Sequence, residues 1–473
     1  MNQISYFATH DLMSFKQTLT WALSGIIVAM LPGCQSNINR EGKMLLLSSH
    51  TQITHSAKHH ALDNNDNFSP DGSYLCYDTR GTVYNNNLAN CKSIEKVAVA
   101  TGVETVLWEP PSVTGEQAAP GVAAVSWHPI DQKVVFIHGP FLEEVDERGH
   151  YTIRNRTGVT VDAGGKGQLT RLDMRDINTS GKTIFGAHRG GTHRHEYTRN
   201  GQRIGFTYDD YLLQNYDRTI GFMVASKDAP EGYSHLFAIL VKPAPKGESA
   251  PGELEKAWDD SWVDKEGKKR AFIGKVRAEN GVDYEQALFT AEIPDNVDIT
   301  TAVSGDAITY PEPPEGIVIR RITHSDWAGG IVRGSNDGKR IAYFGMDTAG
   351  IRQVFVVPEN GSDWAPDPEL QPRQVTDFDT DASCVRWHPG NNWVFAVADG
   401  DIVATYVGEE NAFGTSIWLT NDALERTALV VSPDGNMLAY NIKTPHPTED
   451  TAYTQIYVLP VNMDQLNKIC HDE

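Results

Sequence analysis

The sequence predicts an all-β fold, a seven-bladed β-propeller. Three observations predict it: one turn-and-strand unit recurs along most of the chain, no segment alternates strands with helices around a glycine-rich phosphate turn, and the composition is that of an ordinary folded protein. With 473 residues, 40% of them hydrophobic, the chain can bury a large core, and disorder is excluded.

The first 33 residues indicate a signal peptide. Their apolar run, residues 21–31, is too short to span a bilayer but fits the hydrophobic region of a signal peptide. Residues 31–34, Leu-Pro-Gly-Cys, resemble the lipobox of bacterial lipoproteins, which implies cleavage before Cys34 and lipidation of its thiol. We therefore expect an exported protein, periplasmic or at the cell surface, held to the outer membrane by its lipid anchor. The alternative is an ordinary secretory signal in which Cys34 is incidental.

A polar tether is predicted for residues 34–60, followed by the propeller domain at 61–473. Export places the remaining thiols in an oxidising compartment. Two of them, Cys76 and Cys91, are close enough in sequence to bridge neighbouring strands, but four cysteines allow three pairings and the sequence does not choose among them. The four are Cys76, Cys91, Cys384 and Cys470.

The recurring unit is a turn of Pro, Asp, Asn and Gly residues followed by a strand that alternates apolar with other residues. Asp-Gly and Asn-Gly turns favour a hairpin because these residues tolerate positive φ. Six units begin 44 to 70 residues apart, except for one interval of 137 residues that contains further strands and is expected to hold a seventh, divergent unit. The alternative is a two-sheet sandwich or separate β domains. The six units are residues 69–78, 128–139, 198–210, 335–345, 388–397 and 432–441.

The charge of the chain restricts its partners. The 62 Asp and Glu exceed the 41 Lys and Arg, giving a formal net charge of −21. Nucleic acid is not expected as a partner, because phosphate contacts need a basic face. A polyanionic ligand would have to be met by a local basic patch, which we expect from the Arg and His residues of 189–218 and from the loop near Arg154.

The candidate chemistry lies in predicted blades two and three. His138 ends a strand, His193 and His195 alternate along another, and Tyr208 and Arg218 follow. These residue types suit base-catalysed β-elimination of a uronate. Arg can pair with the carboxylate, a neutral His can remove the adjacent proton, and a Tyr hydroxyl can protonate the leaving oxygen. No nucleophile or redox cofactor is needed for this chemistry.

Three phrases carry a family resemblance: FIHGP at 136–140, RGGTHRHEYTRNGQRIGFTYDD at 189–210 and DRTIG at 217–221. They resemble a bacterial family of seven-bladed propellers that includes the short ulvan lyases and shares its fold with oligogalacturonate lyases. The resemblance implies His138 as a catalytic His and Tyr208 as acid and base.

In the same resemblance, Arg218 is the group that neutralises the carboxylate. The family pattern also has a second His in the loop after the HGP turn; His150 is the nearest candidate here, and Arg154 is the residue that could replace it. The substrate-binding residues expected around these positions are His150, Arg154, Arg189, His193 and His195.

The expected function is thus a polysaccharide lyase, a carbon–oxygen lyase that cleaves a uronate-containing, ulvan-like polymer as a monomer. One alternative is a non-enzymatic propeller that binds a glycan or a protein. Another is a metal-dependent oligouronate lyase that uses His193 and His195, since alternate strand positions can chelate a metal. A structural Zn or other divalent metal is a further alternative, held by Cys384 with His324 or His388.

Overall fold

The computed structural model describes residues 37–38, 44–62, 66–81, 91–110, 121–165, 167–324, 327–408 and 410–471. The chain divides into two compact units, Met1–Ser36 and Asn37–Glu473. The predicted signal peptide and Cys34 lie outside the described residues. Within the described residues, no helix is both long and apolar enough to cross a membrane.

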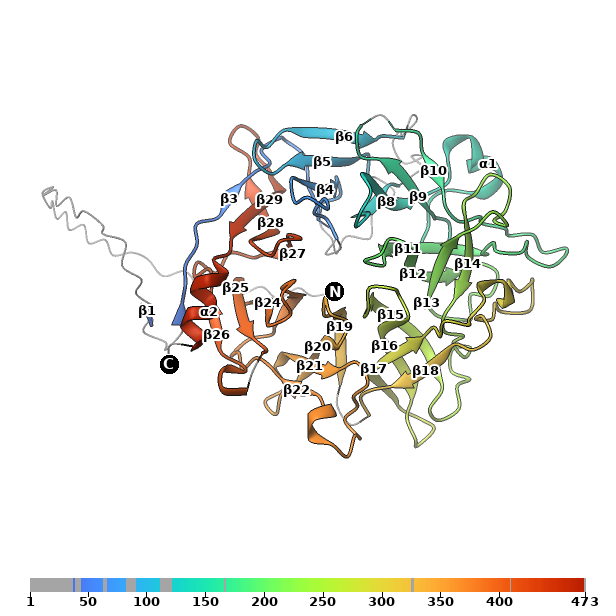
Figure 1. Cartoon of the computed structure of the whole chain (residues 1–473). Helices are drawn as coiled ribbons and strands as arrows, with labels where there is room; N and C mark the ends of the chain where they lie inside the picture. The colour runs from blue at the N-terminus through green and yellow to red at the C-terminus, as the bar shows by residue number, and fades with distance from the viewer. Residues whose placement is uncertain are drawn as a thin grey trace, which may run out of the picture. The chain divides into compact units, whose positions relative to one another are not determined.

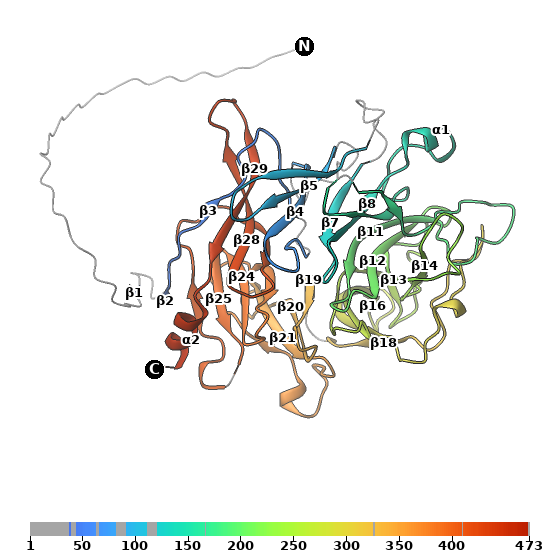
Figure 2. The same cartoon turned by 45° about the horizontal axis from the view of Figure 1, so that its top comes forward.

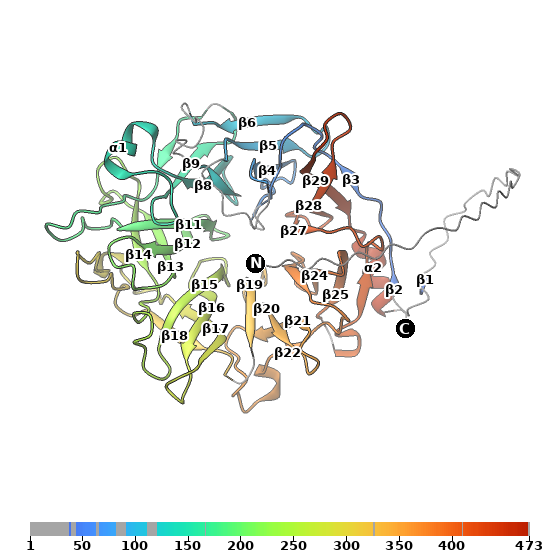
Figure 3. The ribbon, with the colours of Figure 1, turned by 180° about the vertical axis from the view of Figure 1, so that it is seen from behind.

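The second unit is the predicted seven-bladed β-propeller. Its described strands form seven sheets arranged around a common centre (Figure 1). Within each blade, strands that follow one another along the chain are antiparallel neighbours, so each blade is a meander from the centre outward; in blade 6, β2 joins the outer strand β26 in parallel. Figure 3 shows the ring from behind, with β4, β11, β15, β19 and β27 nearest its centre. The fold class expected from the recurring turns is confirmed.

The first four blades contain the following strands. Blade 1 has β4 (Tyr74–Asp78), β5 (Ile94–Ala98) and β6 (Glu104–Trp108). Blade 2 has β7 (Ala123–Trp127), β8 (Lys133–His138), β9 (Thr157–Asp162) and β10 (Thr170–Arg171). Blade 3 has β11 (Gly190–Tyr197), β12 (Arg203–Asp210), β13 (Thr219–Ala225) and β14 (His235–Ile239). Blade 4 has β15 (Leu254–Trp262), β16 (Lys269–Arg277), β17 (Tyr284–Glu292) and β18 (Val318–Arg321).

The last three blades complete the ring. Blade 5 has β19 (Ala328–Gly334), β20 (Arg340–Met346), β21 (Arg352–Pro358) and β22 (Arg373–Gln374). Blade 6 has β23 (Ser383–Trp387), β24 (Trp393–Ala398), β25 (Asp401–Tyr406), β26 (Ser416–Trp418), β2 (Met44–Leu45) and β1 (Asn37–Ile38). Blade 7 has β27 (Thr427–Val431), β28 (Met437–Pro445), β29 (Ala452–Pro460) and β3 (Thr51–Gln52). Two α-helices, α1 (Val145–Arg148) and α2 (Met463–His471), lie outside the blades.

The two ends of the unit meet in the last blades. β3 pairs with β29 in register Gln52 with Tyr457, and β2 pairs with β26 (Figure 2). The segment predicted as a tether, residues 34–60, therefore supplies strands to blades 6 and 7, and the propeller begins before residue 61. These strands could not be predicted from the sequence, because a strand of two residues is too short to show an alternation of apolar and polar side chains.

The predicted turns have one shared hydrogen-bond pattern. In three of them, the Ser hydroxyl donates to the Asp carboxylate two residues later at 2.6 Å, and the following Gly has a positive φ. This φ is open to glycine without the cost that a side chain imposes. The three turns are at Ser69–Gly72, Ser335–Gly338 and Ser432–Gly435.

The innermost strands share a bulge that shapes the centre of the ring. The ladder to the second strand shifts register in blades 2 to 7, and one residue at each shift has a positive φ. Such a bulge interrupts the alternation of side chains and re-aims the residues beside it. The residues with positive φ are Ala124, Arg194, Asp259, Gly330, Cys384 and Ala428.

Cys76, Cys91 and Cys384 are free thiols. Cys76 is fully buried in an apolar cluster with residues of blade 2, and Cys91 is buried beside Asp78. Burial raises the pKa of both thiols. The bridge considered between these two cysteines is absent from the structure.

Candidate functional site

His138, one of the three predicted catalytic residues, is buried at the end of β8. Its side chain is fully inaccessible, its Nδ1 lies 2.7 Å from the carbonyl oxygen of Gly139, and its ring stacks on Phe141 at 4.3 Å. Burial lowers the pKa of His138 to about 4. The imidazole is therefore neutral at pH 7, but solvent does not reach it.

Tyr208, on β12, is also fully buried. Its hydroxyl donates to Asp210 Oδ2 at 2.9 Å and accepts the backbone N–H of Arg189 at 3.2 Å. Burial, and then the charge of Asp210, raise the pKa of the phenol well above its ordinary value. The structure thus surrounds Tyr208 with protein partners.

Arg189 belongs to the same buried network. Its guanidinium donates to Asp210 Oδ2 at 2.6 Å and to the carbonyl oxygen of Thr309 at 2.7 Å, and none of the side chain is accessible. It therefore ties blade 3 to the segment that follows β17. Arg189 was predicted to bind substrate, and it could do so only if these hydrogen bonds opened.

Arg218 precedes β13 and is more accessible. Its Nε donates to Asp209 Oδ2 at 2.9 Å, its Nη2 lies 2.8 Å from the same oxygen, and 27% of the side chain is exposed. Its backbone carbonyl accepts the N–H of Ala257 on β15. Arg218 is thus fixed between blades 3 and 4 with part of its guanidinium open to solvent.

His193 and His195 occupy different surroundings. The alternation of the sequence places them on one face of a strand, but the bulge at Arg194, whose φ is 58°, breaks the alternation between them. His195 is fully buried, with Nε2 3.2 Å from the hydroxyl of Thr192, and burial lowers its pKa to about 4. His193 is half-buried.

The two residues considered for the loop after the HGP turn lie beyond α1. His150 is exposed, and its carbonyl oxygen accepts the side-chain amide of Asn155 at 2.8 Å. Arg154 is half-buried, and its Nε donates to the carbonyl oxygen of Asp210 at 2.9 Å. Arg154 is thus attached to the end of β12, whereas His150 contacts its own loop.

A group of arginines acts electrostatically on His193, which lies on the inner strand β11. We call it the His193 cluster; its members are His193, Arg80, Arg156, Arg194 and Arg218. Burial and then the charges of these four guanidinium groups lower the pKa of His193 well below its ordinary value. The imidazole is therefore neutral at pH 7, and the positive charge of the cluster belongs to the arginines.

Two guanidinium groups of the His193 cluster have unfilled donors. Arg156 is only 2% exposed; its Nη1 donates to the hydroxyl of Tyr151 at 3.0 Å, but its Nε and Nη2 have no hydrogen-bond partner among the described residues. The nearest carboxylate oxygen of Asp209 is 3.9 Å from Nη2. Arg194 is 9% exposed; its Nη1 makes one long bond of 3.4 Å to the carbonyl of Asp260, and its Nε and Nη2 lack hydrogen-bond partners in the described chain. Buried donors of this kind are costly unless an acceptor reaches them.

A central pocket of about 370 Å³ lies further along the same inner strands. Glu196 and Tyr197 of β11 line it, three and four residues beyond His193, which is about 10 Å or more along a strand. Glu196 accepts the hydroxyl of Ser261 at 2.6 Å and pairs with Arg270 at 3.0 Å. Every blade contributes to the lining, so the pocket exists only in the closed ring.

The inner strands of blades 2 to 7 have one equivalent residue each at this end of the ring. It is the first residue after the bulge that pairs again with the second strand of its blade. Two of these are arginines, and burial lowers the pKa of Arg386 to about 10 and that of Arg333 well below its ordinary value. Sequence reasoning missed both, although each stands two residues before the start of a recurring turn. The equivalent residues are Ser126, Glu196, Ser261, Arg333, Arg386 and Val430.

The residues considered as metal ligands lie in different surroundings. His324 Nδ1 is 2.7 Å from Asp363 Oδ1, whereas Cys384 is buried in an apolar cluster around Trp393. In the part of the chain that the structure describes, no three His, Cys, Asp or Glu side chains are grouped so as to hold a metal ion. The metal alternatives stay predictions.

Comparison with known proteins gives the following relatives. Residues 121–230 match a family model described as a protein of unknown function, DUF3748. This segment contains His193, Arg156, Arg194 and Arg218. Over 422 residues the chain is 31% identical to the uncharacterized protein YidR of Escherichia coli K12, covering 82% of this chain and 94% of YidR.

Two solved structures share low similarity with the chain. A putative TolB from Agrobacterium tumefaciens is 11% identical with a TM-score of 0.38, over 76% of this chain and 94% of that one. TolB from Acinetobacter baumannii is 11% identical with a TM-score of 0.35, over 83% of this chain and 65% of that one.

Proposed function

The chain belongs to the family of the uncharacterized Escherichia coli protein YidR, and we propose that it is a non-catalytic propeller that binds a carboxylate-bearing glycan at the His193 cluster. The observation that carries the proposal is the pair of buried guanidinium groups, Arg156 and Arg194, whose Nε and Nη2 donors lack hydrogen-bond partners among the described residues. A carboxylate accepts two parallel hydrogen bonds from one guanidinium, so it matches these donors in charge and in geometry.

The class of ligand follows from the residues and from the family resemblance. The chain carries a net charge of −21, so a polyanion would be repelled by most of its surface and held only where arginines gather. Because the chain resembles propellers that act on uronate polymers, we expect the carboxylate to belong to a uronic acid within a glycan. Arg218, 27% exposed, is the member of the cluster best placed to meet the ligand first.

The burial of two predicted catalytic residues argues for binding without catalysis. The hydroxyl of Tyr208 donates to Asp210, and neither Tyr208 nor His138 is accessible to solvent. A general acid must come within hydrogen-bond distance of the leaving oxygen. The hydroxyl of Tyr208 is already bonded to Asp210 and to the Arg189 backbone, so a polymer would have to break these bonds, whereas Arg156 and Arg194 have donors without a partner among the described residues.

One observation favours a second candidate, the β-elimination of a uronate polymer such as ulvan. His193 is half-buried, its pKa is held well below the ordinary value, and four guanidinium groups act on it. A neutral imidazole beside cations that can neutralise a carboxylate is the combination that this elimination needs. In this candidate His193, rather than Tyr208, is the base.

The test measures binding and turnover on the same samples. We expect tetragalacturonate to bind in isothermal titration calorimetry and its fully methyl-esterified form not to bind, because the ester lacks the charge. Arg156→Gln should weaken binding roughly 10- to 100-fold, as expected for a lost charge-assisted hydrogen bond. Arg373→Gln, at an exposed position on β22, is the matched control and should leave binding unchanged.

Equal binding of the acid and the ester would overturn the proposal. A time-dependent rise in the ultraviolet absorbance of unsaturated uronate, on ulvan or on polygalacturonate, would replace binding by lyase activity. Loss of that rise in His193→Gln, with binding kept, would then assign His193 as the base.

The proposal includes export with a lipid anchor at Cys34, as the first residues of the sequence predict. We expect radiolabelled palmitate to be incorporated into the full-length chain expressed in a Gram-negative host and to be absent from Cys34→Ala. Equal labelling of the two chains would contradict the anchor without bearing on the His193 cluster.

A further inference from the structure

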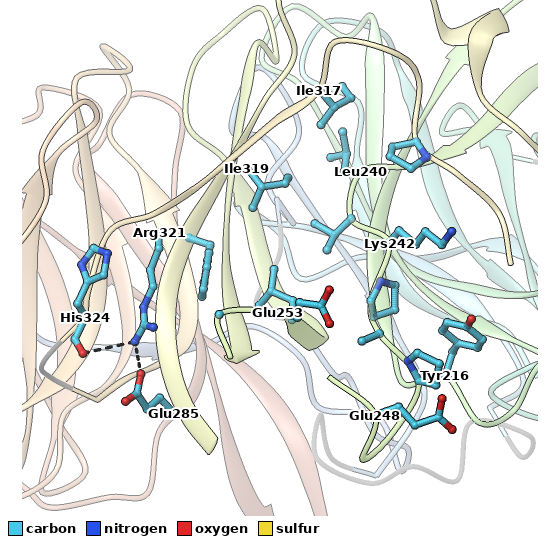
Figure 4. A pocket seen from close by; sticks show the side chains of 18 of the residues that line it. Tyr216, Leu240, Lys242, Glu248, Glu253, Glu285, Ile317, Ile319, Arg321 and His324 are labelled. Atoms are coloured by element: carbon cyan, nitrogen blue, oxygen red, sulfur yellow. Dashed lines mark hydrogen bonds and ion pairs between the residues drawn. The ribbon is translucent and has the colours of Figure 1, made fainter. Parts of the chain in front are cut away.

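A groove of about 930 Å³ runs beside blade 4, separate from the His193 cluster in its lining (Figure 4). We call it the outer groove. Its walls are the segment between β14 and β15, the strands β17 and β18, and the residues that follow β18. The volume is at the upper end of the range for ligand sites, so the groove has room for an extended ligand.

The floor of the outer groove is aliphatic and aromatic. Phe289 of β17 and Leu240 after β14 are buried, and Ile319 of β18 is 37% exposed beside them. Pro243, Pro245 and Pro313 add further apolar surface to the lining. A ligand therefore gains affinity here from aliphatic groups laid on this floor.

Aromatic platforms stand at the two ends of the groove. Trp364 is 69% exposed and stacks on His324 at 3.6 Å with an interplanar angle of 13°. His324 is itself held by Asp363, 2.7 Å from its Nδ1. Tyr216, at the other end, stacks on Tyr310 at 4.1 Å. Figure 4 shows His324 and Tyr216 on opposite sides of the groove.

The charges that line the groove are mainly negative. Its two cations are already paired: Arg321 with Glu285 at 2.5 Å, and Lys242 with Glu312 at 2.5 Å. Three further carboxylates of the lining make no ion pair within the described residues. They are Glu248, Glu253 and Glu279.

This charge pattern decides the kind of occupant. A uronate polymer, the ligand proposed for the His193 cluster, would meet these carboxylates and be repelled. A cationic group would be attracted by them and could also sit over the face of Trp364. The apolar floor requires aliphatic groups on the same ligand.

The sheet beside the groove favours an extended chain. β18 is the outermost strand of blade 4; its one ladder in the described chain is to β17, from Phe289 with Arg321 to Glu292 with Val318. A peptide laid along the other edge of β18 would extend the sheet, and its side chains would point alternately to two sides, one set onto the apolar floor and the other toward the exposed glutamates of the lining.

We propose that the outer groove binds an extended segment of a partner protein in which aliphatic and basic side chains alternate. The aliphatic side chains lie on Ile317 and Ile319, above the buried Phe289, and the basic ones meet Glu253 and its neighbours. This binding does not depend on the glycan proposed for the His193 cluster, because the two sites differ in residues and in the sign of their charge.

Fluorescence anisotropy tests the proposal with two fluorescein-labelled hexapeptides, Lys-Val-Arg-Leu-Lys-Ile and the acidic counterpart Glu-Val-Glu-Leu-Glu-Ile. We expect the basic peptide to bind and the acidic one not to bind. Trp364→Ala should weaken the basic peptide about three- to fivefold, the effect of one exposed cation–π contact. Glu253→Gln should weaken it by a similar factor and reduce its salt dependence.

The matched control is Glu266→Gln, an exposed glutamate between β15 and β16 that does not line the groove. It should bind the basic peptide as the parent protein does, as should Arg156→Gln. Trp364 and Glu253 lie at the surface, so both variants should remain folded. Their thermal unfolding temperatures check this.

Each alternative outcome overturns the proposal. Equal binding of the two peptides, or unchanged binding in Trp364→Ala and Glu253→Gln, removes the outer groove as the site. Full displacement of the peptide by spermidine at equal concentration would show that a small polycation, not an extended chain, is the occupant. None of these outcomes affects the binding of tetragalacturonate.

Discussion

Replacing Arg156 by Met should make the ligand-free protein more stable. In the parent protein the guanidinium is 2% exposed with two donor atoms that lack hydrogen-bond partners among the described residues. Each such donor costs about 1–3 kcal/mol, and the bond to the Tyr151 hydroxyl returns about 1 kcal/mol. Met fills similar volume without donors, so the free energy of unfolding should rise by roughly 1–5 kcal/mol.

The same substitution should abolish stabilisation by the ligand. At a tetragalacturonate concentration about 100 times the Kd, binding to the native state alone adds about 2.7 kcal/mol to the stability of the parent protein. Arg156→Met should show little of this gain. Stability is measured by urea unfolding, followed by tryptophan fluorescence, with and without the ligand.

Arg373→Met, on the exposed outer strand β22, is the control and should lower stability by no more than about 1 kcal/mol, because it removes one exposed contact of the guanidinium with the Phe413 ring, 3.7 Å away. Two results would refute the reasoning. If Arg156→Met unfolds at lower urea than the parent protein, the guanidinium is a structural group whose contacts hold the fold. If the variant keeps the full ligand gain, Arg156 does not contact the ligand.

Further expectations concern Tyr208 and the buried histidines. Tyr208→Phe removes the bond to Asp210 and should lower the free energy of unfolding by about 1–2 kcal/mol with unchanged glycan binding in calorimetry; a loss of binding would contradict the structural role. His138 and His195, with pKa values of about 4, take up protons mainly in the unfolded state, so stability should be complete above about pH 6.5. As the pH falls toward 4, each should cost up to about 1.4 kcal/mol per pH unit in urea titrations, and His195→Phe should flatten the slope. Because His193 has a lowered pKa, glycan affinity should stay constant between about pH 6 and 8; a rise below pH 7 would show a charged imidazole.

The blades were predictable because their turns are local. Ser69 and Asp71 form the turn from their own side chains, and the same pair of residue types recurs at Ser335 and Ser432. Such a turn needs no contact from the rest of the fold, so its own residues are enough to predict it. The closure of the ring was not predictable in this way, because β3 is two residues long and is defined only by its partner β29.

The candidate site was predictable only in part. Residues 189–218 were expected to gather positive charge, and Arg194 and Arg218 do belong to the His193 cluster. The burial of the site residues could not be predicted from the sequence. Tyr208, for example, is buried by residues of other segments that pack on it, such as Phe237. The bulge at Arg194 was also hidden, since it appears only when β11 pairs with β12.

The acidic surplus of the chain and its arginine-lined centre are compatible because the two charge signs gather at different places. Guanidinium groups at the inner edge of a ring stay charged when buried, because their pKa starts far above neutrality. Exposed carboxylates without an ion pair among the described residues, such as Glu248 and Glu253, line the outer groove. A carboxylate ligand and a basic peptide therefore meet different places on one propeller, although buried arginines such as Arg189 are also paired with buried carboxylates such as Asp210. If both proposals hold, tetragalacturonate and the basic hexapeptide should bind together, each without changing the Kd of the other by more than about twofold, since coupling between independent sites is small.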